Sequence, residues 1–143
     1  MSRVISTPNA PTGNAAGPFA YSQAVVAGGL VFVAGQGPVD PETGALVGDT
    51  IQEQTRQAMR NVEAILVAAG SSTDQIVNVL FLLANPEDFA GLNEEWARWF
   101  PTNPPARSGA KFPLAIPNFR ISLSVVAEAG SARVSVRARN SLD

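Results

Sequence analysis

The 143-residue sequence contains neither cysteine nor histidine, and these two absences exclude several classes of function. Without cysteine the chain forms no disulfide and offers no thiol nucleophile, and without histidine it forms no Ser-His-Asp triad. The common zinc sites, which are built from cysteine and histidine, are excluded as well. Carboxylates alone can hold a hard metal ion, but no cluster of acidic residues suggests such a site. We therefore expect neither a metal nor a cofactor.

Charge and long apolar runs are also scarce. Charged residues make up 15% of the chain, the net charge is −2 and the pI is near 5.1, so the sequence lacks the basic excess of a nucleic-acid-binding domain. These values and the missing histidine argue against a nuclease. The N-terminus has no apolar signal-peptide core, and no stretch reaches the roughly 20 apolar residues of a membrane span. We expect a cytoplasmic protein without a membrane or nucleic-acid partner.

The length and the 45% hydrophobic content fit a single domain over residues 1–143 with a substantial core. No linker or internal repeat divides it. Beyond Gly130 the polar and apolar residues of Arg133-Val134-Ser135-Val136-Arg137-Ala138-Arg139 alternate. Residues 131–143 are therefore predicted to be either an extra edge strand or a mobile tail.

The order of local signals predicts an α+β fold. Gly28-Gly29 between two apolar runs is typical of a β-hairpin, and a helix is the clearest element after it. Pro86 suits the first turn of a second helix. The predicted strands cover residues 3–7, 21–27, 30–34, 76–84, the segment around Arg107, and 119–127; the predicted helices cover 50–69 and the residues from about 86 to 100.

The predicted helix over residues 50–69 has an apolar stripe at helical spacing. Thr50 with Glu53 fits a capping box, and Gly70 fits the position after the helix end. The opposite side is polar and is predicted to face solvent; it carries Gln52, Glu53, Arg56, Gln57, Arg60 and Glu63.

The predicted strand over residues 76–84 is apolar on both faces, so both must be covered. One face can take the first helix, and the other needs a second layer or another subunit. Oligomerisation is the simplest way to cover this face of the sheet.

The second helix has a predicted buried face, and Asn93 borders it. A buried amide needs hydrogen-bond partners, so either the backbone satisfies Asn93 or the side chain lines a site. The residues expected on the buried face are Phe89, Leu92, Trp96, Trp99 and Phe100.

Arg107 follows Pro104-Pro105 inside a segment that otherwise reads as a strand. Its planar, always charged guanidinium is suited to gripping a carboxylate. A surface arginine or a structural ion-pair partner are the other interpretations. In the last strand, Ser122 and Ser124 share one face, which indicates that something packs closely over it.

A set of short segments, in order over about residues 4 to 128, matches one family pattern. The segments are Gly17-Pro18, Tyr21-Ser22-Gln23-Ala24-Val25, Leu30-Val31-Phe32-Val33-Ala34-Gly35-Gln36, Asp40-Pro41-Glu42-Thr43-Gly44, Glu53-Gln54-Thr55-Arg56-Gln57-Ala58, Asn61-Val62, Ala68-Ala69-Gly70, Asp88-Phe89-Ala90, Asn93 and Pro105-Ala106-Arg107-Ser108. Each is weak alone, but the ordered set resembles the RidA/YjgF family of small reactive-imine deaminases.

The resemblance implies a chorismate-mutase-like α+β fold, a mixed six-stranded sheet with two helices on one face, assembled as a homotrimer with sites between subunits. It implies hydrolysis of enamines or imines of small 2-keto acids, such as 2-aminoacrylate, to keto acid and ammonia. By the family pattern Arg107 grips the substrate carboxylate and is expected to be catalytic together with Tyr21, while Asn93 lies near the site. The other expected substrate-binding positions are Ala34, Gly35, Gly109 and Ser124.

Two positions depart from the family pattern and leave two functions open. Ser124 stands where a glutamate is expected, and Gly109 stands where cysteine is frequent. Both smaller side chains are expected to enlarge the pocket, which favours a deaminase for a larger imino acid. The alternative is a non-catalytic trimer that binds small carboxylates through Arg107 and has lost the deaminase acid.

Overall fold

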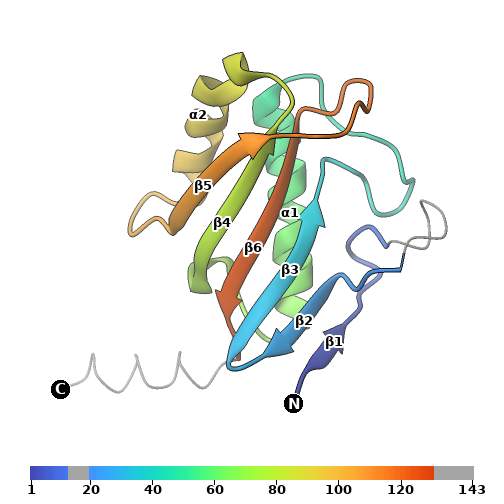
Figure 1. Cartoon of the computed structure of the whole chain (residues 1–143), viewed down its shortest axis with the longest axis vertical. Helices are drawn as coiled ribbons and strands as arrows, with labels where there is room; N and C mark the ends of the chain where they lie inside the picture. The colour runs from blue at the N-terminus through green and yellow to red at the C-terminus, as the bar shows by residue number, and fades with distance from the viewer. Residues whose placement is uncertain (13–19, 131–143) are drawn as a thin grey trace.

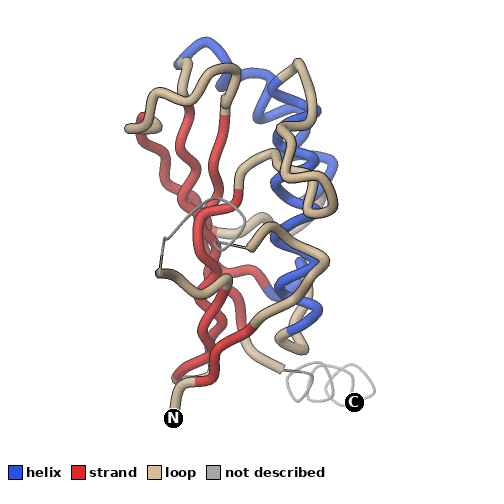
Figure 2. The backbone as a smooth tube through the Cα atoms, turned by 90° about the vertical axis from the view of Figure 1, so that its right-hand side faces the viewer, coloured by secondary structure: helices blue, strands red, loops and turns tan. Residues whose placement is uncertain are grey.

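The computed structural model describes residues 1–12 and 20–130, in which a six-stranded sheet carries both helices on one face (Figures 1 and 2). The tail or strand predicted over 131–143 lies outside the described residues. In sheet order the strands are β1 (Arg3–Ile5), β2 (Ala24–Ala27), β3 (Leu30–Gln36), β6 (Ile121–Glu128), β4 (Ile76–Leu83) and β5 (Ala106–Lys111). The helices are α1 (Ile51–Ala68) and α2 (Phe89–Trp99), with short 3-10 turns at Thr73–Gln75 and Pro86–Asp88.

The sheet is mixed, because β4 and β5 pair in parallel while every other neighbouring pair is antiparallel. The parallel pair is possible because α2 lies between the two strands in the chain and carries it back to the same end of the sheet. The predicted α+β class is therefore confirmed. Neither helix of the described ranges has the length and apolarity to cross a membrane.

A tight turn at Gly28-Gly29 closes the β2–β3 hairpin. Ala27 pairs with Leu30, so only the two glycines lie between the strands. Their φ angles are +59° and +76°, a left-handed conformation that glycine adopts without a steric cost. The predicted hairpin is confirmed, with β2 starting at Ala24 instead of Tyr21.

Helix α1 lies within one residue of the predicted range 50–69 at each end, with Thr50 and Ala69 as its caps. Thr50 Oγ1 accepts a hydrogen bond from the backbone N–H of Glu53 at 3.1 Å and donates one to its carboxylate at 3.1 Å. Gly70 has φ +76°, and the backbone N–H of Ser71 donates to the carbonyl of Leu66 at 2.8 Å. The Thr50 hydroxyl therefore caps the helix as predicted, although the Glu53 carboxylate bonds that hydroxyl instead of the Thr50 backbone N–H, and Gly70 with Ser71 forms a Schellman end.

The core lies between α1 and the side of the sheet that α1 covers. Burying each large aliphatic side chain stabilises the fold by roughly 1.5–3 kcal/mol. The fully buried members include Met59, Val62, Ile65 and Leu66 of α1 and Val31, Val79, Ile121 and Leu123 of the central strands.

The opposite face of the sheet has no cover in the described part of the chain. Phe32 of β3 and Leu80 of β4 point to this side and are 46% and 38% exposed. We call this surface, which also carries Ser122, Ser124 and Val126 of β6, the open face.

The polar side of α1 was predicted to face solvent, and this is wrong for Gln52 and Arg56. Gln52 Nε2 donates to Glu94 of α2 at 2.9 Å, and Arg56 pairs with Glu95 of the same helix. Helix α2 therefore packs along a polar stripe of α1. Polar residues at helical spacing look the same in sequence whether they face water or a matching set of polar partners.

Gln54 joins three segments through a fully buried amide. Its Nε2 donates to the carbonyls of Gly48 at 3.1 Å and Asn118 at 2.7 Å, and its Oε1 accepts from the backbone N–H of Arg120 at 2.8 Å. The residues before α1 and those before β6 are thereby held together.

We expect Gln54→Ala to lower the free energy of unfolding by about 2–3 kcal/mol, because buried backbone groups lose their partners. Gln52→Ala, two residues away, removes an exposed hydrogen bond and should change it by no more than about 0.5 kcal/mol. Urea unfolding of both variants at one protein concentration measures the difference. Equal effects would show that the Gln54 hydrogen bonds do not stabilise the fold.

Candidate functional site

Arg107 lies on β5, and its side chain points to the face of the sheet covered by the helices. It pairs with Val79 of β4, which is fully buried on that face. The guanidinium carbon lies 5.0, 5.5 and 5.4 Å from the ring centres of Phe81, Phe89 and Trp96. Three aromatic rings therefore surround a cation at the edge of the sheet, and their π-electrons stabilise its charge.

Asn93 holds one edge of this guanidinium. Its Oδ1 accepts a hydrogen bond from Arg107 Nη1 at 2.9 Å, and both side chains are partly buried. The sequence left two interpretations of Asn93, a side chain satisfied by the backbone or a side chain that lines a site. In the structure its side chain contacts Arg107, a candidate site residue. Among the described residues no carboxylate lies within ion-pair distance of Arg107, which leaves no support there for a structural ion pair. The remaining N–H groups can meet a planar carboxylate.

An apolar pocket of about 450 Å³ extends from the aromatic rings towards the ends of β4 and β5. Phe89 stacks on Phe81 with ring centres 5.8 Å apart and forms a wall of the pocket. The prediction that Phe89 is buried is wrong, since it is 45% exposed. The Phe89 ring lies at the β5 edge of the sheet, and no other segment of the described chain covers its outer side. The pocket is lined by Phe81, Leu83, Pro86, Phe89, Gly109, Ala110 and Lys111.

Gly109 lies in this pocket, opposite Phe81 in the β4–β5 register. A Cβ atom at Gly109 would collide with the tip of the Phe81 ring. The ring therefore occupies the space that a side chain at position 109 would take. The expectation that Gly109 simply enlarges the pocket is wrong in this respect: the glycine admits an aromatic ring beside Arg107.

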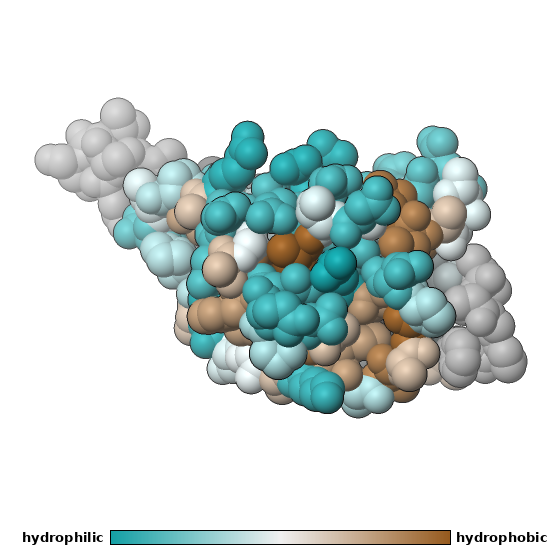
Figure 3. All heavy atoms as spheres, turned by 90° about the horizontal axis from the view of Figure 1, so that it is seen from above, coloured by the Kyte–Doolittle hydropathy of each residue, from teal (hydrophilic) through white to brown (hydrophobic). Residues whose placement is uncertain are grey.

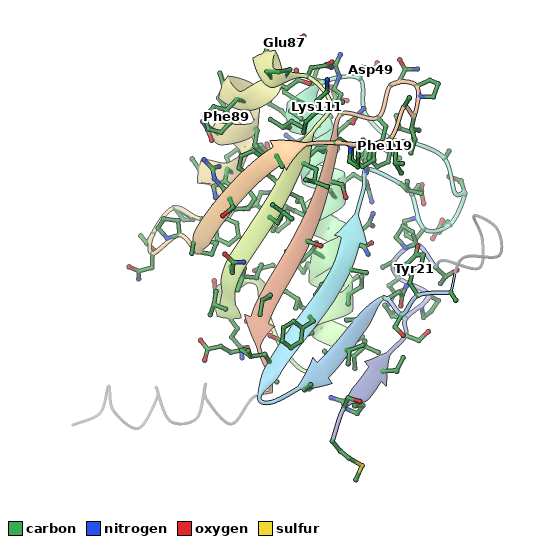
Figure 4. All side chains as sticks on the ribbon, in the orientation of Figure 1. Tyr21, Asp49, Glu87, Phe89, Lys111 and Phe119 are labelled. Atoms are coloured by element: carbon green, nitrogen blue, oxygen red, sulfur yellow. The ribbon has the colours of Figure 1, made fainter. Side chains whose placement is uncertain are left out.

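Tyr21 and Gly35 lie elsewhere in the chain. Both line a cavity of about 660 Å³ formed with the turn around Asp40. Gly35 is on β3 and Arg107 is on β5, and β6 and β4 lie between them, which separates the two positions by roughly 14 Å. Figure 4 shows Tyr21 at the β2 side of the sheet and Phe89 at the β5 side. A single chain does not bring these candidate residues together around one small ligand.

Ser124 pairs with Leu80 and lies on the open face, so its side chain points away from the Arg107 side. Ser122, on the same face, lies closer to another candidate residue, because a Cβ atom at Gly35 would be 3.1 Å from its Oγ. Gly35 and Ala34 lie where the β3–β6 register shifts. The alternation of side chains along β6 predicts that Ser122 and Ser124 share a face. Only the observed pairing of β3 with β6 shows that Ser122 is the one beside Gly35.

The side chains around Arg107 supply a cation, an amide and apolar rings. They can bind and orient an anion, but they include no group that exchanges a proton near neutral pH. Among residues 1–12 and 20–130, no group of three or more acidic side chains is placed to hold a metal ion.

An ion pair holds α2, and with it Asn93, against α1. Arg56 donates from Nε and Nη2 to the two carboxylate oxygens of Glu95 at 2.9 and 3.0 Å. The Glu95 side chain is 4% exposed and that of Arg56 is 36% exposed. The hydrogen bond to Glu95 and its negative charge raise the pKa of Arg56 above its ordinary value. The arginine of this pair therefore stays charged throughout the neutral and mildly alkaline range.

We expect Arg56→Ala to lower the free energy of unfolding by about 2 kcal/mol, because it leaves a nearly enclosed carboxylate without its partner. Replacing both residues, Arg56→Met with Glu95→Met, should restore most of this loss. Arg60→Ala, on an exposed position of the same helix, is the control. If the double variant is no more stable than Arg56→Ala, burial of the unpaired carboxylate is not the cause.

Comparison with known proteins gives consistent matches along the chain. The family model described as endoribonuclease L-PSP matches residues 9–129. The human 2-iminobutanoate/2-iminopropanoate deaminase is 38% identical over 128 residues, which cover 90% of each chain. A RutC family protein of Pyrococcus horikoshii is 47% identical over 107 residues, 75% of this chain and 82% of the relative.

Solved structures agree with the sequence matches. The crystal structure of E. coli TdcF with bound serine superposes with a TM-score of 0.79 and 31% sequence identity, and the match covers 90% of this chain and 99% of TdcF. The fold expected from the sequence is therefore confirmed by a solved relative.

Proposed function

The chain belongs to the endoribonuclease L-PSP family, which is the RidA/YjgF family of the sequence resemblance, and on this premise we propose that it hydrolyses enamines and imines of small 2-keto acids. The observation that carries the proposal is the Arg107 cluster: a guanidinium held by Asn93 and three aromatic rings, with donors left for a carboxylate. Relatives that are named as reactive-intermediate and imine deaminases support the reaction class.

Arg107 is proposed to bind the substrate carboxylate through two parallel hydrogen bonds. This contact fixes the plane of the carboxylate and with it the direction of the neighbouring C=N bond. Burial among aromatic rings strengthens the interaction, because water competes less for the guanidinium there than at an open surface. The related TdcF was crystallised with bound serine, an amino acid that carries a carboxylate of this kind.

The reaction needs little more than a positioned water. An enamine first gains a proton at its carbon and becomes the iminium. The iminium carbon is already electrophilic, so water adds to it, and a proton passes from the added oxygen to the nitrogen to give a carbinolamine ready to lose its amine. The carbinolamine loses ammonia and leaves the keto acid, which balances as imine plus water giving keto acid plus ammonia. No metal or cofactor enters this scheme. Backbone groups and hydroxyls such as those of Tyr21 and Ser122 can orient the water.

We further propose that the complete site forms between chains of a homotrimer. Two observations support this. The Tyr21–Gly35 cavity and the Arg107 cluster are separated by two intervening strands in one chain. The open face exposes Phe32 and Leu80, which a second copy of the chain would cover. A neighbouring subunit can then place its Tyr21 beside Arg107.

A non-catalytic carboxylate-binding protein is the second candidate. The observation in its favour is that the described residues around Arg107 contain no acid, while Ser124 of β6 occupies the position where the family pattern expects a glutamate. Such a protein would bind 2-keto acids through Arg107 without turnover. An RNA-cleaving function has weaker support, because the chain has a net charge of −2 and no histidine.

Arg107→Ala should lower kcat/KM for imine hydrolysis by about 100-fold or more, because a charge-assisted bidentate contact is lost. Arg107→Lys should recover only part of this, since an ammonium group cannot form the planar fork. The assay measures release of keto acid from imines that an amino-acid oxidase generates in situ.

Arg98→Ala is the control, because Arg98 is an exposed arginine of α2. Its activity should equal that of the wild type. If the wild type does not accelerate keto-acid release but binds 2-keto acids through Arg107, the carboxylate-binding candidate replaces the deaminase.

Mixing two inactive variants tests the shared site. If Tyr21 of one chain and Arg107 of another form each site, co-refolded Tyr21→Ala and Arg107→Ala chains should regain about a quarter of the sites in random trimers. The refolded mixture should run as a trimer in light scattering. A monomeric mass, or no recovery of activity in the mixture when both single variants are inactive, would contradict the shared site.

A further inference from the structure

The apolar pocket beside Arg107 has walls that the hydrolysis itself does not need. We infer that this pocket receives the side chain of the imino acid whose carboxylate Arg107 holds, so that the preferred substrates are imines of 2-keto acids with branched or aromatic side chains. The inference rests on the proposed function, which supplies the carboxylate contact. The walls are formed by Phe81, Leu83, Pro86, Phe89 and Gly109.

The pocket adjoins the carboxylate position through two shared rings: Arg107 does not line the pocket itself, but Phe81 and Phe89 belong both to the pocket wall and to the Arg107 cluster. Arg107, Gly109 and Lys111 are alternate residues of β5 and face the same side of the sheet. The Cα atoms of successive members of this series lie about 7 Å apart. Phe81 and Phe89 line the pocket, and their ring centres lie only 5.0 and 5.5 Å from the Arg107 guanidinium carbon. A side chain on the carbon next to the bound carboxylate therefore reaches these rings directly.

The shape of the pocket depends on glycine at position 109. Because a Cβ atom there would collide with Phe81, only glycine lets the ring lie across β5 and present its face beside Arg107. Phe89 adds a second, stacked ring from the start of α2. The two rings, inclined by 27° to each other, form an apolar wall that a methyl group of a small substrate covers only in part.

The far end of the pocket is open. Lys111 lies there, and Figure 4 shows Lys111 and Phe89 at the same end of the molecule. Figure 3 looks onto this end and shows apolar surface in brown between polar side chains in teal. Within one chain, a long side chain can therefore extend outward past Lys111. Lys111 is the charged residue of the pocket lining, so an imine with an acidic side chain tests whether the lysine or the apolar wall selects the substrate.

The experiment compares kcat/KM for imines generated in situ from alanine, leucine, phenylalanine and glutamate. We expect the wild type to prefer the leucine- and phenylalanine-derived imines over the alanine-derived imine by about tenfold or more, the discrimination that an apolar pocket gives. Phe89→Ala should reduce this ratio by about tenfold, and Gly109→Ala should reduce it as well by displacing Phe81. Val67→Ala, an exposed apolar position of α1, is the control and should keep the ratio.

A separate readout distinguishes the pocket from the reaction. Calorimetry compares binding of 4-methyl-2-oxopentanoate and pyruvate, the keto acids that correspond to leucine and alanine. Tighter binding of the larger acid without any turnover would support the pocket and overturn the deaminase proposal. Turnover with a preference for the alanine- or glutamate-derived imine would overturn the pocket and keep the deaminase. If Phe89→Ala lowers kcat/KM equally for all imines, the pocket proposal is also overturned, because the Phe89 ring would then act only by positioning Arg107.

Discussion

The parallel pairing of β5 with β4 is the constraint on which the candidate site depends. It sets Arg107 opposite the buried Val79 and Gly109 opposite Phe81. A shift of one residue would turn Arg107 to the open face and remove it from the aromatic rings. Helix α2, which connects the two strands, then brings Asn93 and Trp96 to the same side. The positions of the Arg107 cation, of Asn93 that hydrogen-bonds it and of the apolar wall therefore all follow from the β4–β5 register.

Most of the fold could be predicted from local chemistry. Gly28-Gly29, the Thr50–Glu53 cap and Gly70 each specify backbone geometry without reference to the rest of the chain. Local sequence already marked Arg107 and Asn93 as candidates, the family resemblance assigned them to one site, and the structure brings them into contact. What could not be predicted depends on partners distant in sequence: the polar stripe of α1 pairs with α2, and Phe89 lines a pocket. Hydrophobic period gives the face of an element, but not the element that covers it.

The candidate residues fall into two groups, and a single physical picture accounts for this separation. The Arg107 cluster lies at the β5 edge on the helix side, whereas Tyr21 and Gly35 lie beyond β6 and β4. The same chain leaves an apolar open face with Phe32 and Leu80. In the proposed assembly, a neighbouring chain covers this face and also approaches the β5 edge, where Arg107 lies, so that it completes the site. Substrate binding would then depend on assembly as well as on fold.

The most direct test of this account is a crystal structure of the protein with bound 4-methyl-2-oxopentanoate. We expect the carboxylate to lie on the free edge of the Arg107 guanidinium, the branched side chain to pack against Phe81 and Phe89, and Tyr21 of a neighbouring chain to approach the ligand. A ligand bound in the cavity around Tyr21 of one chain, with no contact to any Arg107, would contradict it.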